Sequence, residues 1–152
     1  MFIKYLIETD DSPAQLCNRV ALGVVIFPHG AQKVFGWFDG PGLAKTIQLF
    51  AETGFPAWSV MLLMLVECVG SLLLIAGLFS RLWALGLGFS MAVCMFMNHV
   101  QNGFFMNWYG TQQGEGFEFH LLLFGLAGAL LIGGSGRFSL DRALFRRIEG
   151  RQ

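Results

Sequence analysis

Residues 57–78, AWSVMLLMLVECVGSLLLIAGL, decide the fold class, because they form a nearly unbroken apolar stretch. About 20 such residues in an α-helix cover the hydrocarbon core of a bilayer. Residues 82–98, LWALGLGFSMAVCMFMN, form a second stretch of this kind, and residues 118–134, EFHLLLFGLAGALLIGG, form a shorter one. The sequence therefore predicts an all-α integral membrane protein.

The composition of the 152-residue chain agrees with a membrane environment. Hydrophobic residues make up 55% of the chain and charged residues only 13%, whereas a soluble domain carries about 25% charged residues. The formal net charge is zero, so the composition favours no polyanionic partner such as nucleic acid. We expect the lipid bilayer to be the main partner of this surface.

A further span, the first in the chain, is predicted over residues 14–36, although polar residues interrupt it and Pro28 removes a backbone donor near its middle. Four spans place the N-terminus, the turn at 79–81 and the C-terminal tail on one side of the membrane. That side then holds most of the basic residues: Lys4, Arg19, Arg81, Arg137, Arg142, Arg146, Arg147 and Arg151. Because basic residues concentrate in cytoplasmic segments, we expect both termini in the cytoplasm.

The predicted architecture is a four-transmembrane-helix bundle that forms a single membrane domain over residues 1–152. Its spans lie at about 14–36, 57–78, 82–98 and 118–134. Residues 43–52 are amphipathic and predict a short interfacial helix on the outer surface. Residues 139–152 form the cytoplasmic tail, where Ser139 is a candidate N-cap for a basic amphipathic helix.

Small residues recur every four positions on the third and fourth predicted spans. Such stripes let helix backbones approach closely inside a membrane. They predict a tight bundle, and because two chains could pack through the same pattern, a homo-oligomer stays an open alternative. The stripes are Gly86, Ser90, Cys94 and Asn98 in the third span and Gly125, Ala129 and Gly133 in the fourth.

Glu67 lies near the centre of the second span, where an unpaired carboxylate is costly. His29 and Lys33 are one helical turn apart in the first span, share one face and are candidate partners. Arg19 lies fourteen residues before Lys33, which returns it to within about 40° of that face. Glu67 is therefore either a proton-handling or ligand-binding group, or a structural anchor between helices.

The three histidines, His29, His99 and His120, fall toward the outer side of the predicted bundle. With Glu115 and Glu118 they predict a polar mouth. Glu118 and His120 point about 200° apart around a helix, so they cannot bind one ion together. We therefore expect no metal site, and the three scattered cysteines form no CxxC pair.

The chain resembles the DoxX family of small four-helix bacterial membrane proteins from about Arg19 to Arg142. Seven short motifs in the same order carry this resemblance. They are R-x-x-L-G at 19–23, H-G-x-x-K at 29–33, E-x-x-G at 67–70, G-L-x-x-R at 77–81, G-F-F at 103–105, G-E-G-x-E-x-H at 114–120 and G-x-G-x-x-S-L-D at 134–141.

The resemblance implies a protein of the bacterial cytoplasmic membrane with both termini inside. It also implies a link to quinone-coupled oxidation of reduced sulfur compounds, or to membrane complexes that protect against oxidative and thiol stress. The polar positions that match the family pattern predict one polar site between the first, second and fourth spans. They are Arg19, His29, Lys33, Glu67, Arg81, Glu115, Glu118 and His120.

The function favoured by these residues is that of a redox-linked membrane subunit that binds a quinone and supplies its protons. The catalytic candidates are Glu67, His29 and His120, and the binding candidates are Arg19, Lys33, Glu115 and Glu118. No motif for haem, flavin or an iron–sulfur centre is present, so electrons would come from a soluble redox partner. The alternatives are a non-catalytic scaffold that docks an enzyme through the basic tail or the 99–117 loop, and a carrier of small solutes or protons.

Overall fold

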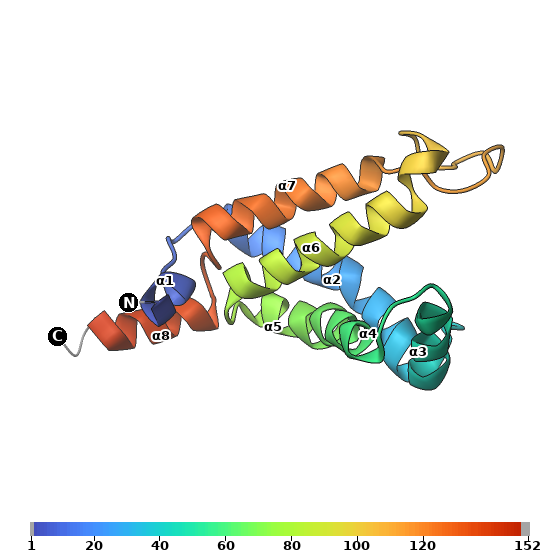
Figure 1. Cartoon of the computed structure of the whole chain (residues 1–152). Helices are drawn as coiled ribbons and strands as arrows, with labels where there is room; N and C mark the ends of the chain where they lie inside the picture. Colours follow the sequence, from blue (N-terminus) through green and yellow to red (C-terminus); the bar gives the residue numbers. More distant parts are fainter. Residues whose placement is uncertain (1, 150–152) are drawn as a thin grey trace.

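The computed structural model describes residues 2–149, and these residues form only helices and the segments that join them (Figure 1). The helices are α1 (Phe2–Ile7), α2 (Pro13–Phe35), α3 (Gly42–Glu52), α4 (Ala57–Met64), η1 (Leu65–Gly70), α5 (Ser71–Ala76), α6 (Ser80–Asn98), η2 (Val100–Asn102), α7 (Glu118–Gly133) and α8 (Leu140–Glu149). The all-α prediction is confirmed, and a helical segment lies over each predicted span. The last three positions of the predicted tail, 150–152, lie outside the described residues.

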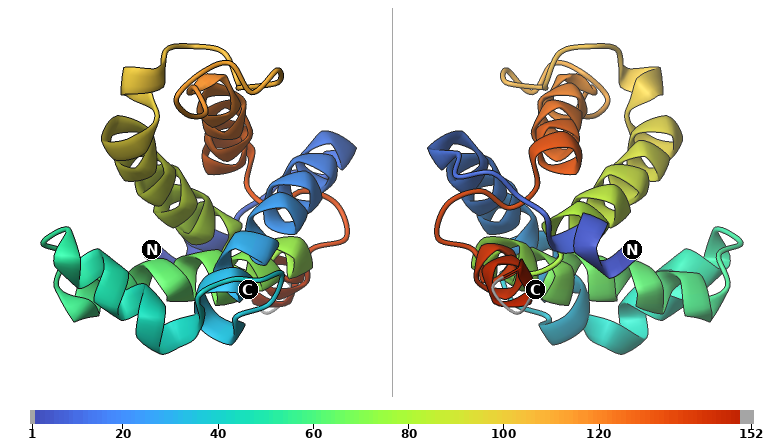
Figure 2. Two further views of the ribbon diagram at one scale, coloured as in Figure 1. Left: turned by 90° about the vertical axis from the view of Figure 1, so that its right-hand side faces the viewer. Right: turned by 90° about the vertical axis from the view of Figure 1, so that its left-hand side faces the viewer.

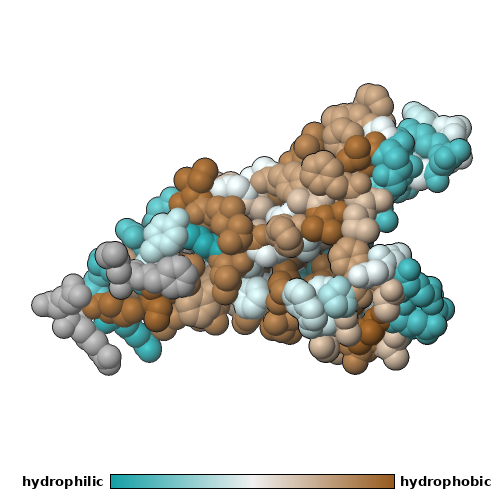
Figure 3. Space-filling model, viewed as in Figure 1, coloured by the Kyte–Doolittle hydropathy of each residue, from teal (hydrophilic) through white to brown (hydrophobic). Residues whose placement is uncertain are grey.

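Two helical segments of the described chain have the length and apolar composition to cross a membrane. These are Ala57–Ala76, built from α4, η1 and α5, and Ser80–Asn98, which is α6. Helix α7 is apolar but shorter. Large apolar side chains on these helices face outward, such as Phe89, which is 72% exposed, and Ile132, which is 84% exposed. Figure 3 shows the resulting apolar surface across the middle of the molecule, as expected for a surface that faces lipid.

Helix α2 is central to the packing, because it contacts η1, α5, α7 and α3. Helices α6 and α7 pack along each other and diverge from α4 toward one end of the molecule (Figure 1). A core of buried apolar side chains lies between α2, α5, α6 and α7. Its members are Leu22, Ile26, Leu74, Ala84, Leu87, Met91, Leu123, Ala127 and Leu130.

The molecule has two distinct ends. We call the end that carries α3 and the segment between α6 and α7 the loop end, and the opposite end the terminal end. Helices α1 and α8 pack together at the terminal end, where Lys4 Nζ lies 3.5 Å from a carboxylate oxygen of Glu149 (Figures 1 and 2). The two ends of the chain therefore lie on the same side of the bundle. Helix α1 was not predicted from the sequence.

Buried charges at the terminal end satisfy the backbone at helix ends. The Arg81 guanidinium donates to the carbonyl oxygens of Leu131 and Ile132, each at 3.0 Å, at the end of α7. The Asp141 carboxylate accepts hydrogen bonds from the backbone N–H groups of Phe79 and Ser80, at 2.8 and 3.2 Å, at the start of α6. Each charge has the sign that the adjacent helix dipole favours.

The turn between α5 and α6 requires glycine at position 77. Gly77 has a φ of +71°, and a Cβ there would lie 2.5 Å from the Cβ of Ser139. The Ser139 hydroxyl accepts a hydrogen bond from the Arg142 backbone N–H at 3.2 Å. This contact confirms the predicted N-cap of α8.

The small-residue stripes differ in what they pack against. A Cβ at Gly86 would lie 3.1 Å from Val66, so α6 approaches η1 closely at this position. A Cβ at Gly125, by contrast, would have no atom of another segment within 4 Å among the described residues. The sequence predicted a close approach of a second helix along the stripe on α7. At Gly125 the structure shows none.

Candidate functional site

The centre of the candidate site is a buried ion pair between α2 and η1. Lys33 Nζ lies 2.6 Å from Glu67 Oε2, and the two side chains are 22% and 3% exposed. Among the ion pairs of residues 2–149, this pair is the least exposed. Lys33 Nζ also donates to the backbone carbonyl of His29 at 3.3 Å. Glu67 is therefore paired with Lys33, while His29 contributes a backbone carbonyl to the pair.

A close approach of two backbones positions this pair. A Cβ at Gly30 would lie 2.5 Å from the backbone nitrogen of Cys68 and 2.6 Å from the carbonyl carbon of Glu67. Only a glycine leaves room for α2 and η1 to touch here. Lys33, one turn further along α2, then reaches the carboxylate.

Glu67 lies within a π-helical turn. The segment η1 interrupts the α-helical hydrogen bonding between α4 and α5, and the Ser71 hydroxyl donates to the backbone carbonyl of Glu67 at 2.6 Å. Turns of this kind are rare within α-helices and occur frequently at functional sites. The helix geometry therefore singles out the same residue as its buried charge.

An apolar groove lies on the same helices as the ion pair, although neither Lys33 nor Glu67 lines it. It has a volume of about 260 Å³ and is formed by α2, α3, α4 and η1. Val34, which follows Lys33, and Cys68, which follows Glu67, both line it. Its apolar lining is typical of the walls of sites for small apolar ligands.

Glu115 and Glu118, two predicted binding residues, organise the segment before α7. Glu118 Oε1 accepts from the backbone N–H of Met106 at 3.0 Å and from the indole N–H of Trp108 at 3.3 Å. Glu115 Oε2 accepts from the backbone N–H of Asn107 at 2.6 Å. Both carboxylates therefore hold this segment in place at the loop end.

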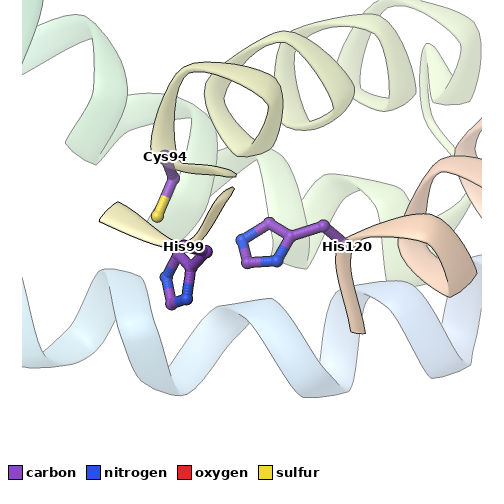
Figure 4. Close-up of side chains that lie close together, drawn as sticks. All are labelled: Cys94, His99 and His120. Atoms are coloured by element: carbon purple, nitrogen blue, oxygen red, sulfur yellow. The ribbon is translucent and has the colours of Figure 1, made fainter. Parts of the chain in front are cut away.

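His120, a predicted catalytic residue, belongs to a different group of side chains from Glu67. It lies in the first turn of α7, is 4% exposed, and its ring centroid is 4.5 Å from that of His99. With Cys94 these histidines form a group whose potential ligand atoms all lie within 4.8 Å of one another (Figure 4). The sequence reasoning compared Glu118 with His120 and missed this group. Cys94 and His99 are five residues apart, about 1.4 helical turns, so helical periodicity gave no signal for this group.

Arg19 lies outside the predicted polar site, which is a correction. It is 2% exposed, and its guanidinium donates to the carbonyl oxygens of Ser135 at 3.0 Å and Phe138 at 2.8 Å, near the terminal end. Around the axis of α2, Arg19 does lie close to the face that carries Lys33. However, fourteen residues at 1.5 Å each separate the two by about 21 Å along the axis. Arg19 therefore joins α2 to the turn before α8.

The predicted single site thus divides into parts. The structure brings together Lys33, Glu67 and the backbone of His29 on one side. It brings together Cys94, His99 and His120 on the other. Lys33 lies near the end of α2 and His99 directly follows α6, so both parts lie toward the loop end.

A family model described as DoxX matches residues 14–100, the part of the chain from α2 to η2. The chain belongs to the DoxX family. The matched segment of this DoxX protein contains both Lys33 and Glu67, and it ends before His120.

Two curated relatives are similar to this DoxX protein. The "Uncharacterized membrane protein Rv3486" of Mycobacterium tuberculosis (strain ATCC 25618 / H37Rv) is 33% identical over 150 residues, which cover 93% of this chain and 88% of the relative. The "Putative oxidoreductase CatD" of Bacillus subtilis (strain 168) is 31% identical over 67 residues, or 44% of this chain and 46% of the relative. No solved structure matches the chain. Family membership and the first relative identify the chain as a membrane protein, in agreement with its apolar surface.

Proposed function

We propose that this DoxX protein is a quinone-interacting membrane subunit of an oxidoreductase, with the Lys33–Glu67 pair at the quinone head group. The observation that carries the proposal is the burial of this pair, in which Glu67 is nearly inaccessible and Lys33 stays partly exposed. An intramembrane ion pair of this kind is expensive, and such residues commonly serve in proton or ligand handling. The name of one relative, "Putative oxidoreductase CatD", agrees with a redox role.

The chemistry of quinones suits these groups. Reduction of a quinone takes up one proton for each electron, so the site must supply protons to the two carbonyl oxygens. The Lys33 ammonium can donate a proton to one oxygen, and Glu67 can relay a replacement proton to Lys33. The other oxygen would take its proton from water at the loop end. The apolar groove beside the pair would hold the ring or the isoprenoid tail. Electrons would come from a soluble redox partner.

The same proposal includes the topology. We place α2, the α4–η1–α5 segment, α6 and α7 across the bacterial cytoplasmic membrane, with both termini in the cytoplasm. Basic residues at the terminal end, such as Arg81 and Arg146, support this orientation. A reporter enzyme that is active only in the cytoplasm should be active when fused after residue 152. Activity of a reporter that works only outside the cytoplasm would refute the orientation.

Quinone binding tests the functional claim. The purified protein in mild detergent is titrated with a short-chain quinone, and binding is followed by quenching of tryptophan fluorescence. A lost charge-assisted hydrogen bond costs about 1.5–3 kcal/mol, so Glu67→Gln should weaken binding by about tenfold or more. The matched control, Glu52→Gln, alters an exposed carboxylate on α3 and should bind as the wild type does. Equal affinity in all three proteins would refute the role of Glu67.

A further inference from the structure

We propose that Cys94, His99 and His120 bind a transition-metal ion, and that Zn²⁺ is the ion that suits them best. The three residues come from the last two turns of α6, the residue that follows it and the first turn of α7. One potential ligand atom of each lies within 4.8 Å of the other two. Figure 4 shows the Cys94 thiol and the His120 ring both directed toward the His99 ring. This site is independent of the proposed quinone function.

The distances fit closure around one ion. Zinc bonds of about 2.0–2.1 Å to nitrogen and 2.3 Å to sulfur place tetrahedral ligand atoms about 3.3–3.6 Å apart. The observed limit of 4.8 Å exceeds this separation by about 1.2–1.5 Å, which side-chain rotations can remove. The two ring centroids are already 4.5 Å apart, at an interplanar angle of 49°.

The hydrogen bond of His99 leaves its other ring nitrogen free for a metal. Nδ1 lies 2.9 Å from the backbone carbonyl oxygen of Glu115. A carbonyl oxygen only accepts, so Nδ1 carries the hydrogen and Nε2 keeps its lone pair. Metal-ligating histidines almost always donate their second nitrogen in this manner, which fixes the tautomer and the ring orientation.

The ring of His120 provides an independent observation. Its Nδ1 atom is buried and has no hydrogen-bond partner among the described residues. A buried polar nitrogen without a partner costs free energy, and few such atoms occur in native proteins. No hydrogen bond to a described residue therefore holds this ring in another orientation, and Figure 4 shows the ring directed toward His99.

The donor set selects the class of ion. A thiolate with two imidazoles suits zinc and similar borderline or soft ions, whereas Mg²⁺ and Ca²⁺ prefer oxygen ligands. Three protein ligands leave the fourth tetrahedral position for an external ligand, as in catalytic zinc sites. The site therefore has the composition of an open zinc site at the loop end of the bundle.

Zinc titration tests the proposal on the full-length protein in mild detergent. The protein is stripped with a chelator, and Zn²⁺ binding is measured by competition with a chromophoric chelator. We expect one ion per chain. Because loss of an outer-shell partner already costs 10–100-fold in affinity, Cys94→Ser and His120→Gln should each weaken binding by about 100-fold or more. The control, Cys17→Ser, changes an exposed cysteine on α2 and should bind Zn²⁺ as the wild type does.

A cobalt spectrum of the wild type keeps the test valid if a variant fails to fold. Bound Co²⁺ should give a thiolate-to-cobalt charge-transfer absorption in the wild type and in Cys17→Ser. The band should be absent from Cys94→Ser. Folded wild type that binds less than one Zn²⁺, or that shows no such band, would overturn the proposal. Unchanged Zn²⁺ affinity in Cys94→Ser would overturn it as well.

Discussion

Replacing Lys33 by methionine should destabilise the protein more than replacing Glu67 by glutamine, although both changes break the same ion pair. Without Lys33, the Glu67 side chain stays 3% exposed with no counter-charge, and an uncompensated buried charge costs about 3–5 kcal/mol. Without the Glu67 charge, Lys33 is already 22% exposed and can extend toward water. The cost of Glu67→Gln should therefore be smaller, about 1–2 kcal/mol.

The assay is reversible unfolding in mixed micelles with increasing SDS, followed by circular dichroism. The double variant should recover part of the loss, with an interaction energy of about 2 kcal/mol between the two positions. Lys45→Met and Glu52→Gln repeat the same substitutions at exposed positions of α3 and should change stability by less than about 0.5 kcal/mol. Equal losses in the two single variants, or losses that simply add in the double variant, would refute the reasoning.

Three further predictions concern helix contacts and the terminal end. Gly30→Ala places a Cβ 2.5 Å from the backbone of η1 and should lower the free energy of unfolding by about 1–3 kcal/mol in the same assay. The control Gly128→Ala adds a Cβ with nothing within 4 Å and should leave stability unchanged or increase it. Equal effects of the two variants would contradict the close approach of α2 and η1. Asp141→Ala removes the acceptor for two N–H groups at the start of α6 and should cost about 1–2 kcal/mol; an unchanged unfolding midpoint would contradict this capping role. The hydrogen bond from Arg137 holds the pKa of Asp11 below its ordinary value of 3.8. The Asp11–Arg137 pair therefore stabilises the folded state above pH 3.8, and this stabilisation is lost as the pH falls through the lower pKa that Asp11 has in the folded state. Asp11→Asn should therefore lower the thermal midpoint at neutral pH and have no effect in strong acid, and a pH-independent difference would argue against the pair.

Much of the fold could be predicted because apolar length and helix-stop residues act locally. The stretch at 57–78 forms helix from Ala57 to Ala76 and ends at Gly77, which adopts a left-handed conformation. The Ser139 cap was likewise readable, since it depends on only four consecutive residues, 139–142. The π-helical turn around Glu67 was not readable, because it depends on how η1 packs against α2 and α6.

The candidate site was predicted less completely, for a geometric reason. Helical periodicity gives the angle of a side chain around one helix, and it therefore placed Lys33 and Glu67 among the buried charges. It gives no information on which helices are neighbours. The group of Cys94, His99 and His120 joins the end of α6 to the start of α7 across a loop of irregular structure, so only the three-dimensional fold brings it together.

The most direct test of the account is to ask which small molecule this protein retains from the membrane. Wild type, Glu67→Gln and Glu52→Gln are purified in mild detergent, and their bound lipids are extracted and identified by mass spectrometry. The account predicts a stoichiometric quinone in the wild type and in Glu52→Gln, and its loss in Glu67→Gln. No quinone in any of the three, or the same amount in Glu67→Gln as in the wild type, would contradict it.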